Sequence, residues 1–284
     1  MANGFRVARI FHFRWFLIAV AVASLTTWWL MDQPRRRDKA ILSAAKVGGV
    51  VQLDDAHRPD RPPSTADKIG SPGWLMERLS RGLAHDVTVV NLDGLPISDA
   101  DLAGFDGVRS LRRLYLNGTP ITDRGMTHLG SMTGLEILEL RETKISDAGL
   151  SDLARLPRLR SLNLYETRIT DAGLADLARS GGLVELGLGH TAVGDPGLVH
   201  LARLEGMKTL RLARTRVTDA GLVSLSGMKK LEYLDLARTA VTDEGLESLS
   251  ALTELKWLFV DGTGVTEAGK ARLRRALPAV RVFR

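Results

Sequence analysis

A period of 24 residues runs through residues 87–278 and constrains the fold more than any other feature of the chain. Eight consecutive rows align without an insertion or a deletion, and they start at Val87, Leu111, Leu135, Leu159, Leu183, Met207, Leu231 and Leu255. A fixed period of this length is typical of stacked repeats, in which each unit buries its apolar side chains against its neighbours. The sequence therefore predicts a solenoid.

Each row has two halves with different hydrophobic periods. The first half reads L-x-x-L-x-L, so that Leu138 alternates with Ile137 and Glu139, and this period of two predicts a short strand buried on one side. The second half reads I-S/T-D-x-G-L-x-x-L, as at Ser146 and Asp147. A hydroxyl followed by a carboxylate is typical of a helix start. Stacking places the strands in a parallel sheet on the inner curve and the helices on the outer curve.

The rows resemble leucine-rich repeats, specifically a 24-residue bacterial type with an ITDAGL core, seen here at residues 169–174 and related to F-box-associated and GALA-type repeats. The resemblance implies an α/β leucine-rich repeat solenoid and a binding role without a defined partner. Many relatives carry Asn or Cys at the ninth place of the row. Here we expect a Thr hydroxyl to bond to backbone between turns, at Thr119, Thr143, Thr167, Thr191, Thr215, Thr239 and Thr263. The first row has Leu95 there and lacks that contact.

Composition and charge exclude several kinds of site. The chain has 284 residues, 44% of them apolar, and no Cys, which excludes disulfides, thiolate metal sites and thiol nucleophiles. The formal charge is +6, but residues 1–40 carry seven basic and two acidic residues, a net of +5, which leaves +1 for the rest. Because the repeats lack a basic stripe, we expect no binding to nucleic acid.

A basic tail at residues 1–14 is followed by an uncharged apolar segment at residues 15–31, which predicts a single transmembrane helix acting as a signal-anchor. Trp15 at one end and Trp28 and Trp29 at the other suit the two membrane interfaces. Two alternatives remain open. Residues 21–23 match the small-x-small pattern of a cleaved signal peptide, and the segment also suits a buried helix of a soluble domain.

The orientation of that helix depends on the flanking arginines. Arg6, Arg9 and Arg14 favour a cytoplasmic N-terminus, whereas residues 35–37 are also arginines and favour the reverse. A short basic tail ahead of the first apolar segment usually decides the orientation. We therefore expect the repeats on the non-cytoplasmic side.

Residues 32–86 are predicted to form a linker and an N-terminal cap. The sequence predicts a helix at residues 37–46, a break at Gly48 and Gly49, a strand at residues 50–53, a Pro-rich loop at residues 54–73 and a capping helix at residues 74–83. This layout resembles the region ahead of the repeats in membrane-anchored bacterial relatives.

The last row departs from the pattern. Lys270 stands where Leu is expected, and we expect this polar side chain to face the position of a next repeat. Pro278 should end the last helix, and residues 279–284 are predicted to add a capping strand, in which Arg281 and Arg284 discourage end-to-end pairing.

No catalytic motif stands out. The six histidines show no HExxH spacing, and there is neither a P-loop nor a G-x-S-x-G sequence, so we predict that the protein is not an enzyme and uses no cofactor. One acidic column recurs at Asp99, Asp123, Asp147, Asp171, Asp195, Asp219 and Asp243. One carboxylate per strand spacing does not converge on a cation, so we assign the column to helix starts and expect no metal. The glycines two places later, such as Gly149 and Gly173, are predicted to be packing residues of the first helical turn.

The third, fifth, seventh and eighth places of the rows vary, and they define a predicted concave face. Exposed aromatic and arginine side chains on a rigid surface are typical of protein interfaces. The predicted contact residues are Arg113, Tyr115, Glu139, Arg141, Asn163, Tyr165, Glu185, His190, Arg211, Arg214, Tyr233, Asp235, Arg238, Trp257 and Phe259, and Glu142 and Glu166 lie among them. An alternative is that Trp257 and Phe259 only cover the C-terminal end. Tyr233 and Trp257 are expected to be neighbours about 5 Å apart on adjacent strands.

Three functions are compatible with this pattern. We favour a membrane-anchored scaffold that binds a protein or peptide on its concave face, with no small-molecule substrate. A second is a regulator or inhibitor that occludes the active site of a partner enzyme. A third, a ubiquitin-ligase adaptor, follows from the F-box relatives, but no F-box-like helical module precedes the repeats.

Overall fold

The computed structural model describes residues 45–53, 87–106 and 108–283. The predicted basic tail at residues 1–14, the apolar segment at residues 15–31, the Pro-rich loop and the capping helix at residues 74–83 lie outside these ranges. In the ranges that are described, no helix has both the length and the apolar character needed to cross a membrane.

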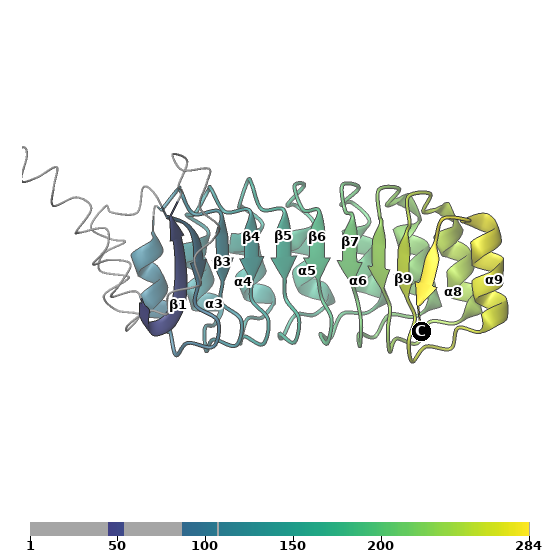
Figure 1. Cartoon of the computed structure of the whole chain (residues 1–284), viewed down its shortest axis with the longest axis horizontal. Helices are drawn as coiled ribbons and strands as arrows, with labels where there is room; N and C mark the ends of the chain where they lie inside the picture. Colours follow the sequence, from purple (N-terminus) through teal and green to yellow (C-terminus); the bar gives the residue numbers. More distant parts are fainter. Residues whose placement is uncertain (1–44, 54–86, 107, 284) are drawn as a thin grey trace, which may run out of the picture.

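The described strands form one elongated sheet in sequence order from β1 to β10 (Figure 1). Strand β1 is antiparallel to β2, and every later pair is parallel with a register offset of 24 residues, so that Leu138 lies between Leu114 and Leu162. The strands are β1 Ala45–Leu53, β2 Val87–Asn91, β3 Arg113–Tyr115, β4 Ile137–Glu139, β5 Ser161–Asn163, β6 Glu185–Gly187, β7 Thr209–Arg211, β8 Tyr233–Asp235, β9 Trp257–Phe259 and β10 Arg281–Phe283.

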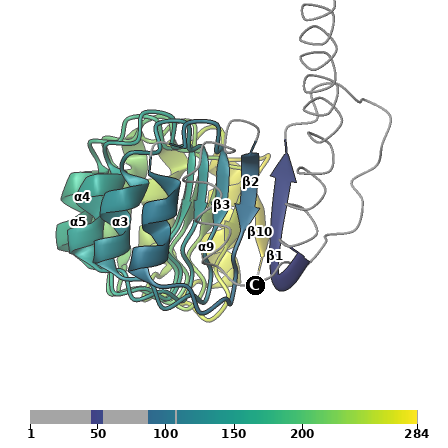
Figure 2. The same ribbon diagram turned by 90° about the vertical axis from the view of Figure 1, so that its left-hand side faces the viewer.

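The helices cover one face of this sheet and leave the other face open (Figure 2). They are η2 Asp99–Phe105, α3 Asp123–Leu129, α4 Asp147–Leu153, α5 Asp171–Leu177, α6 Asp195–Leu201, α7 Asp219–Leu222 with η3 Val223–Gly227, α8 Asp243–Ser248 with η4 Leu249–Ala251, and α9 Glu267–Ala276. The predicted solenoid is confirmed. We call the uncovered side the open sheet face; it corresponds to the predicted concave face.

The core is a strip of leucines between the sheet and the helices. Leu162 on β5 is 1% exposed, and Leu150 and Leu153 on α4 are fully buried. Since each row contributes equivalent side chains at 24-residue intervals, the core continues without interruption from Val90 to Val280. The two hydrophobic periods of each row are therefore confirmed as the strand and the helix of one repeat.

The aspartate column has a stronger role than that of a helix start. The carboxylate of Asp147 accepts hydrogen bonds from the backbone N–H (2.8 Å) and the hydroxyl (2.6 Å) of Thr170 in the next repeat. The same pair of bonds joins Asp99 to Thr122, Asp123 to Ser146, Asp195 to Thr218, Asp219 to Thr242 and Asp243 to Thr266. The carboxylates thus clamp adjacent repeats together, and the prediction of a purely helix-start role was incomplete.

The glycine column makes room for this clamp. A Cβ atom added at Gly173 would lie 2.9 Å from Cγ of Asp147 and 2.9 Å from Cδ1 of Leu150. A Cβ at Gly149 would likewise lie 2.8 Å from Oδ1 of Asp123. The glycines are therefore packing residues, as predicted, and the group that they accommodate is the carboxylate of the preceding repeat.

The threonines at the ninth place do not link turns, contrary to the prediction. The Oγ1 atom of Thr143 donates to the carbonyl oxygen of Leu140, three residues earlier in the same turn, at 2.7 Å. Thr119, Thr167 and Thr215 make the same bond. A hydroxyl is shorter than an Asn side chain, so it reaches only its own turn, and the aspartates provide the contact between repeats.

Two predictions at the ends of the array were wrong. Strand β1 extends through Gly48 and Gly49, where a helix end and a break were expected, and it continues into the residues Val50, Val51 and Gln52 that pair with β2. Lys270 is 3% exposed and occupies the core position of the missing leucine, with its Nζ atom 2.8 Å from Oε1 of Glu267. The predicted capping strand is confirmed by β10, which pairs in parallel with β9.

Candidate protein-binding face

The predicted contact residues lie along the open sheet face and its edge, and the structure divides them into groups. One group surrounds a depression on β4 to β8, a second forms an aromatic line on β8 to β10, and a third occupies the turns that follow the strands. Arg113 and Tyr115 lie on β3, beyond the residues that line the depression.

The depression has a volume of about 500 Å³. It exists because the row that contributes β6 carries Gly187 and Gly189 where its neighbours carry larger side chains, and Ala213 in the next row is also small. Seven predicted residues line it: Glu139, Arg141, Asn163, Tyr165, Glu185, Arg211 and Asp235. Ser161, Leu162, Gly187, Gly189 and Ala213 complete the lining and were missed. Two glycines at variable places of one row were the sequence signal that could have located it.

Tyr165 forms one wall of the depression. The guanidinium carbon of Arg141 lies 5.0 Å from the centre of the Tyr165 ring, within the range of a cation–π contact. A Cβ atom at Gly189 would lie 2.8 Å from Cδ2 of the same ring, so glycine is required for the ring to rest against the backbone. Arginine and tyrosine thus hold each other in place before any partner binds.

Carboxylates provide the opposite charge. Glu139 accepts a hydrogen bond from Nδ2 of Asn163 at 2.8 Å, and Oε2 of Glu185 accepts one from the hydroxyl of Ser161 at 3.2 Å. Burial raises the pKa of Glu139, and the bond from Asn163 and the charge of Arg141 oppose that rise. The depression therefore offers both signs of charge beside an aromatic ring, a combination suited to a polypeptide surface.

The aromatic line begins with Arg211, whose guanidinium carbon lies 5.1 Å from the centre of the Tyr233 ring. Tyr233 contacts Phe259 with ring centres 5.0 Å apart, and Phe259 stacks on Phe283 at 4.7 Å. Burial raises the pKa of Tyr233. Phe283 on β10, which is 40% exposed, was not among the predicted residues.

Trp257 lies beside this line. It pairs with Tyr233 in the register of β8 and β9, as predicted. Among the described rings, however, Tyr233 contacts Phe259 on the diagonal, and Trp257 is instead 39% exposed with Nζ of Lys256 6.0 Å from its ring centre. The aromatic surface is therefore continuous through Phe259.

The eighth place of the rows has an unusual backbone. Five non-glycine residues there have φ angles of 56–57°, in the left-handed region: Glu142, Glu166, His190, Arg214 and Arg238. Gly94, Gly118 and Gly262 occupy the same place in three other rows. The left-handed conformation costs about 1–2 kcal/mol for each residue with a Cβ atom, so these five side chains are retained against a local preference for glycine.

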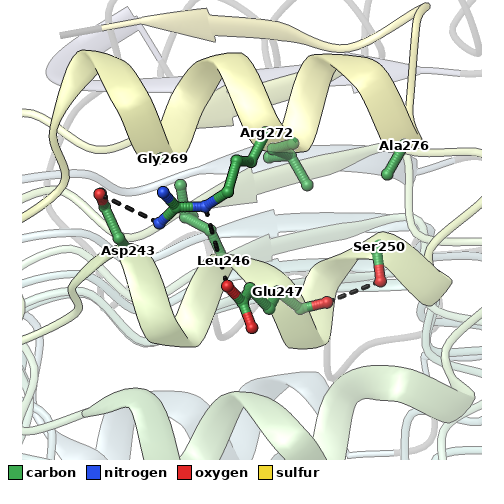
Figure 3. Close-up of a pocket in the computed structure, with 8 residues that line it drawn as sticks. Asp243, Leu246, Glu247, Ser250, Gly269, Arg272 and Ala276 are labelled. Carbon is green, nitrogen blue, oxygen red and sulfur yellow. Dashed lines mark hydrogen bonds and ion pairs between the residues drawn. The ribbon is translucent and has the colours of Figure 1, made fainter.

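A second hollow lies on the helical side, between α8 and α9 (Figure 3). Its volume is about 240 Å³, and Leu246, Leu273 and Ala276 contribute its apolar part. Arg272 spans it, with Nη2 3.3 Å from Asp243 and Nε 3.7 Å from Glu247. This guanidinium is already paired with two carboxylates, and we assign the hollow to helix packing. The described ranges contain no group of three or more His, Cys, Asp or Glu side chains arranged to hold a metal ion.

Comparison with known families agrees with this geometry. The family described as Leucine Rich repeat matches at residues 109–130, 132–154 and 227–250, three segments that each contain a strand and the helix after it. The chain contains leucine-rich repeats. No curated protein matches it.

Two of the solved structures that match the chain are internalins of Listeria monocytogenes. Internalin C2 is 21% identical, the match covers 86% of this chain and 92% of that chain, and the TM-score is 0.55. A second internalin, inlF, is 18% identical over 78% of this chain and 90% of that chain, with a TM-score of 0.38. The likeness to internalin C2 supports the leucine-rich repeat fold and extends no further.

Proposed function

We propose that this leucine-rich repeat protein is a scaffold that binds a protein or peptide partner on its open sheet face and catalyses no reaction. The observation that carries the proposal is the depression over Gly187 and Gly189, with Arg141 and Tyr165 already ordered against each other at its wall. Side chains that are ordered before binding lose less conformational entropy when a partner docks.

The chemistry of this face favours a polypeptide over a small metabolite. Its aromatic and arginine side chains are the types that contribute most to the energy of protein interfaces. They extend beyond the depression, because the line from Arg211 through Tyr233 and Phe259 to Phe283 reaches the last described strand. Together the two groups extend from β4 to β10, an area that suits an extended segment or a folded surface.

We also propose that residues 15–31 anchor the protein in a membrane, with the repeats on the non-cytoplasmic side. The support is the sequence: an uncharged apolar segment bounded by Trp15 and by Trp28 and Trp29, with a basic tail before it. Protease added to cells with a permeabilised outer envelope should digest the repeats. Survival of the repeats until the inner membrane is lysed would reverse the orientation, and release of the protein by high salt alone would reject the anchor.

The binding proposal is tested by identifying partners through proximity labelling with the full chain and then measuring the affinity of the purified partner. Tyr165→Ala, Tyr233→Ala and Trp257→Ala should each weaken binding by about 2 kcal/mol or more if the partner docks over them. Arg179→Ala and Arg203→Ala are the matched controls, because both side chains are exposed near the ends of helices on the opposite side.

Thermal melts of the same variants separate binding from folding. Loss of affinity in the two arginine variants, with the aromatic variants unchanged, would place the binding surface on the helices and reject the proposal. A lower melting temperature for Trp257→Ala without a loss of affinity would mean that this residue only caps the array.

A further inference from the structure

The five residues with left-handed backbone form an exposed row along one edge of the open sheet face, which we call the charged edge row. Along successive repeats it reads Glu142, Glu166, His190, Arg214 and Arg238. All five side chains are exposed. The row occupies five consecutive repeats, and glycines take the same place on either side of it, at Gly118 and Gly262.

The contacts that these five side chains make within the chain do little to offset the cost of their left-handed backbone. Nδ1 of His190 lies 3.3 Å from Glu166, and Nε of Arg238 lies 3.9 Å from Asp261, both pairs between side chains about half exposed. Within the described part of the chain, Glu142 and Arg214 take part in no ion pair. Glycine would fit this turn without strain, as it does at Gly118 and Gly262. The contacts between described residues therefore do not explain why charged side chains occupy the row.

The order of the charges identifies what they fit. In one direction the row reads two acids, a histidine and two arginines, and in the opposite direction it reads two arginines, a histidine and two acids. When two copies of the row are laid antiparallel, each acid therefore faces a base, and His190 faces His190. A surface with this property is complementary to itself about a two-fold axis, as the interface of a symmetric dimer must be.

We propose that two copies of this protein associate in antiparallel fashion along the charged edge row, with the two-fold axis at His190. Glu142 of each copy then faces Arg238 of the other, and Glu166 faces Arg214. Successive members of the row lie in the turns that follow neighbouring strands, which stand side by side along the array (Figure 1) about 5 Å apart in both copies. The four pairs therefore come into register together.

The centre of the dimer is compatible with two histidines. Each His190 lies against Glu166 of its own chain and 6.0 Å from the ring of Tyr165, so carboxylates surround the place where the two imidazoles meet. Exposed ion pairs are individually weak and are screened by salt. The dimer is accordingly weak and dissociates as the ionic strength rises.

Reversing charge tests the pairing directly. Arg214→Glu with Arg238→Glu leaves four acidic residues around His190, and Glu142→Arg with Glu166→Arg leaves four arginines around it. Each variant alone should weaken self-association by roughly tenfold or more. An equimolar mixture of the two should pair, and the chain carrying all four changes should associate like the parent, because its reversed row is again complementary to itself.

The experiment is sedimentation of the full chain in mild detergent at low and high salt, with thermal melts to show that each variant is folded. Arg216→Glu is the matched control, because this exposed arginine lies two residues from Arg214 and outside the row. It should leave association within about twofold of the parent, since it removes none of the four pairs. A parent chain that stays monomeric at about 100 μM and low salt, a concentration that corresponds to a binding free energy of roughly 5 kcal/mol, would overturn the proposal. So would a dimer that both charge-reversed variants form as readily as the parent.

Cross-linking locates the axis. The natural chain has no Cys, so His190→Cys provides a single thiol for a short bis-maleimide. The His190→Cys chain should cross-link to itself. Glu142→Cys and Arg238→Cys should each cross-link poorly alone and well when mixed, because residue 142 of one copy faces residue 238 of the other. Efficient self-linking through residue 142 or 238, or none through residue 190, would refute the antiparallel arrangement.

Discussion

The clamp between repeats can be tested at Asp147 and Gly173, where a carboxylate of one repeat fills the space left by a glycine of the next. Alanine at position 173 would normally stabilise a helix by about 1 kcal/mol relative to glycine. Here its Cβ atom would lie 2.9 Å from Cγ of Asp147 and 2.9 Å from Cδ1 of Leu150, both closer than ordinary contact. Overpacking of this kind costs about 1–3 kcal/mol. We therefore expect Gly173→Ala to destabilise the protein by about 1 kcal/mol.

Removing the carboxylate of Asp147 should abolish the destabilising effect of Gly173→Ala. Asp147→Ala breaks two hydrogen bonds from Thr170 to a charged group and leaves a half-buried N–H without its partner, at a cost of about 2–3 kcal/mol. With the carboxylate gone, the remaining close contact of alanine at position 173 is Cδ1 of Leu150, at the flexible end of that side chain. Gly173→Ala should then be neutral or stabilising by up to about 1 kcal/mol. The coupling between the two sites is about 1–2 kcal/mol, as expected for residues in contact.

The assay is reversible urea denaturation of the parent, the two single variants and the double variant, followed by circular dichroism and tryptophan fluorescence. Coincidence of the two signals is needed, because long repeat arrays lose two-state behaviour. Gly227→Ala is the control, since a Cβ atom there has no neighbour within 4 Å, and it should be nearly neutral. If Gly173→Ala changes stability equally in both backgrounds, the aspartate is only a helix-start residue and the clamp does not exist.

Three further predictions follow from other sites. Leu162→Ala should cost about 2–5 kcal/mol in urea denaturation, because the side chain is 1% exposed in the middle of the core; a loss below 1 kcal/mol would show that the stack collapses around the gap. Arg214→Gly should leave stability unchanged or raise it by up to about 1 kcal/mol, since it relieves a left-handed residue with a Cβ atom, and a clear loss would show that the side chain is structural. Hydrogen bonds from Lys208 (2.8 Å) and Lys256 (2.5 Å) lower the pKa of Glu232 to about 2, so its contribution to stability is complete above pH 4.5 and is lost as the pH falls toward 2. Carboxyl NMR titration should find that value and a rise in Lys256→Ala, and an ordinary pKa in the parent would refute the assignment.

The sequence by itself determined the architecture, because the same pattern of apolar residues recurs in every row of 24 residues. A leucine or valine at the fourth and sixth places of all eight rows leaves only one arrangement in which each row buries its apolar side chains. The first strand, the capping strand and the burial of Leu162 followed from it. Seven residues of the depression were also predictable, because their places alternate with the buried leucines and must face away from the helices.

Tertiary structure decided what depends on contacts between rows. Asp147 bonds to Thr170, which is 23 residues away in the next row. The space at Gly173 in turn depends on where the Asp147 carboxylate lies. The sequence of a single row therefore shows neither the hydrogen bond nor the lack of space. Lys270 is buried although its sequence suggests exposure, because the helix before β10 still packs on the core and Glu267 neutralises the ammonium. The depression and the charged edge row likewise appear only when the rows are stacked, since stacking brings residues 24 apart in sequence to within one strand of each other.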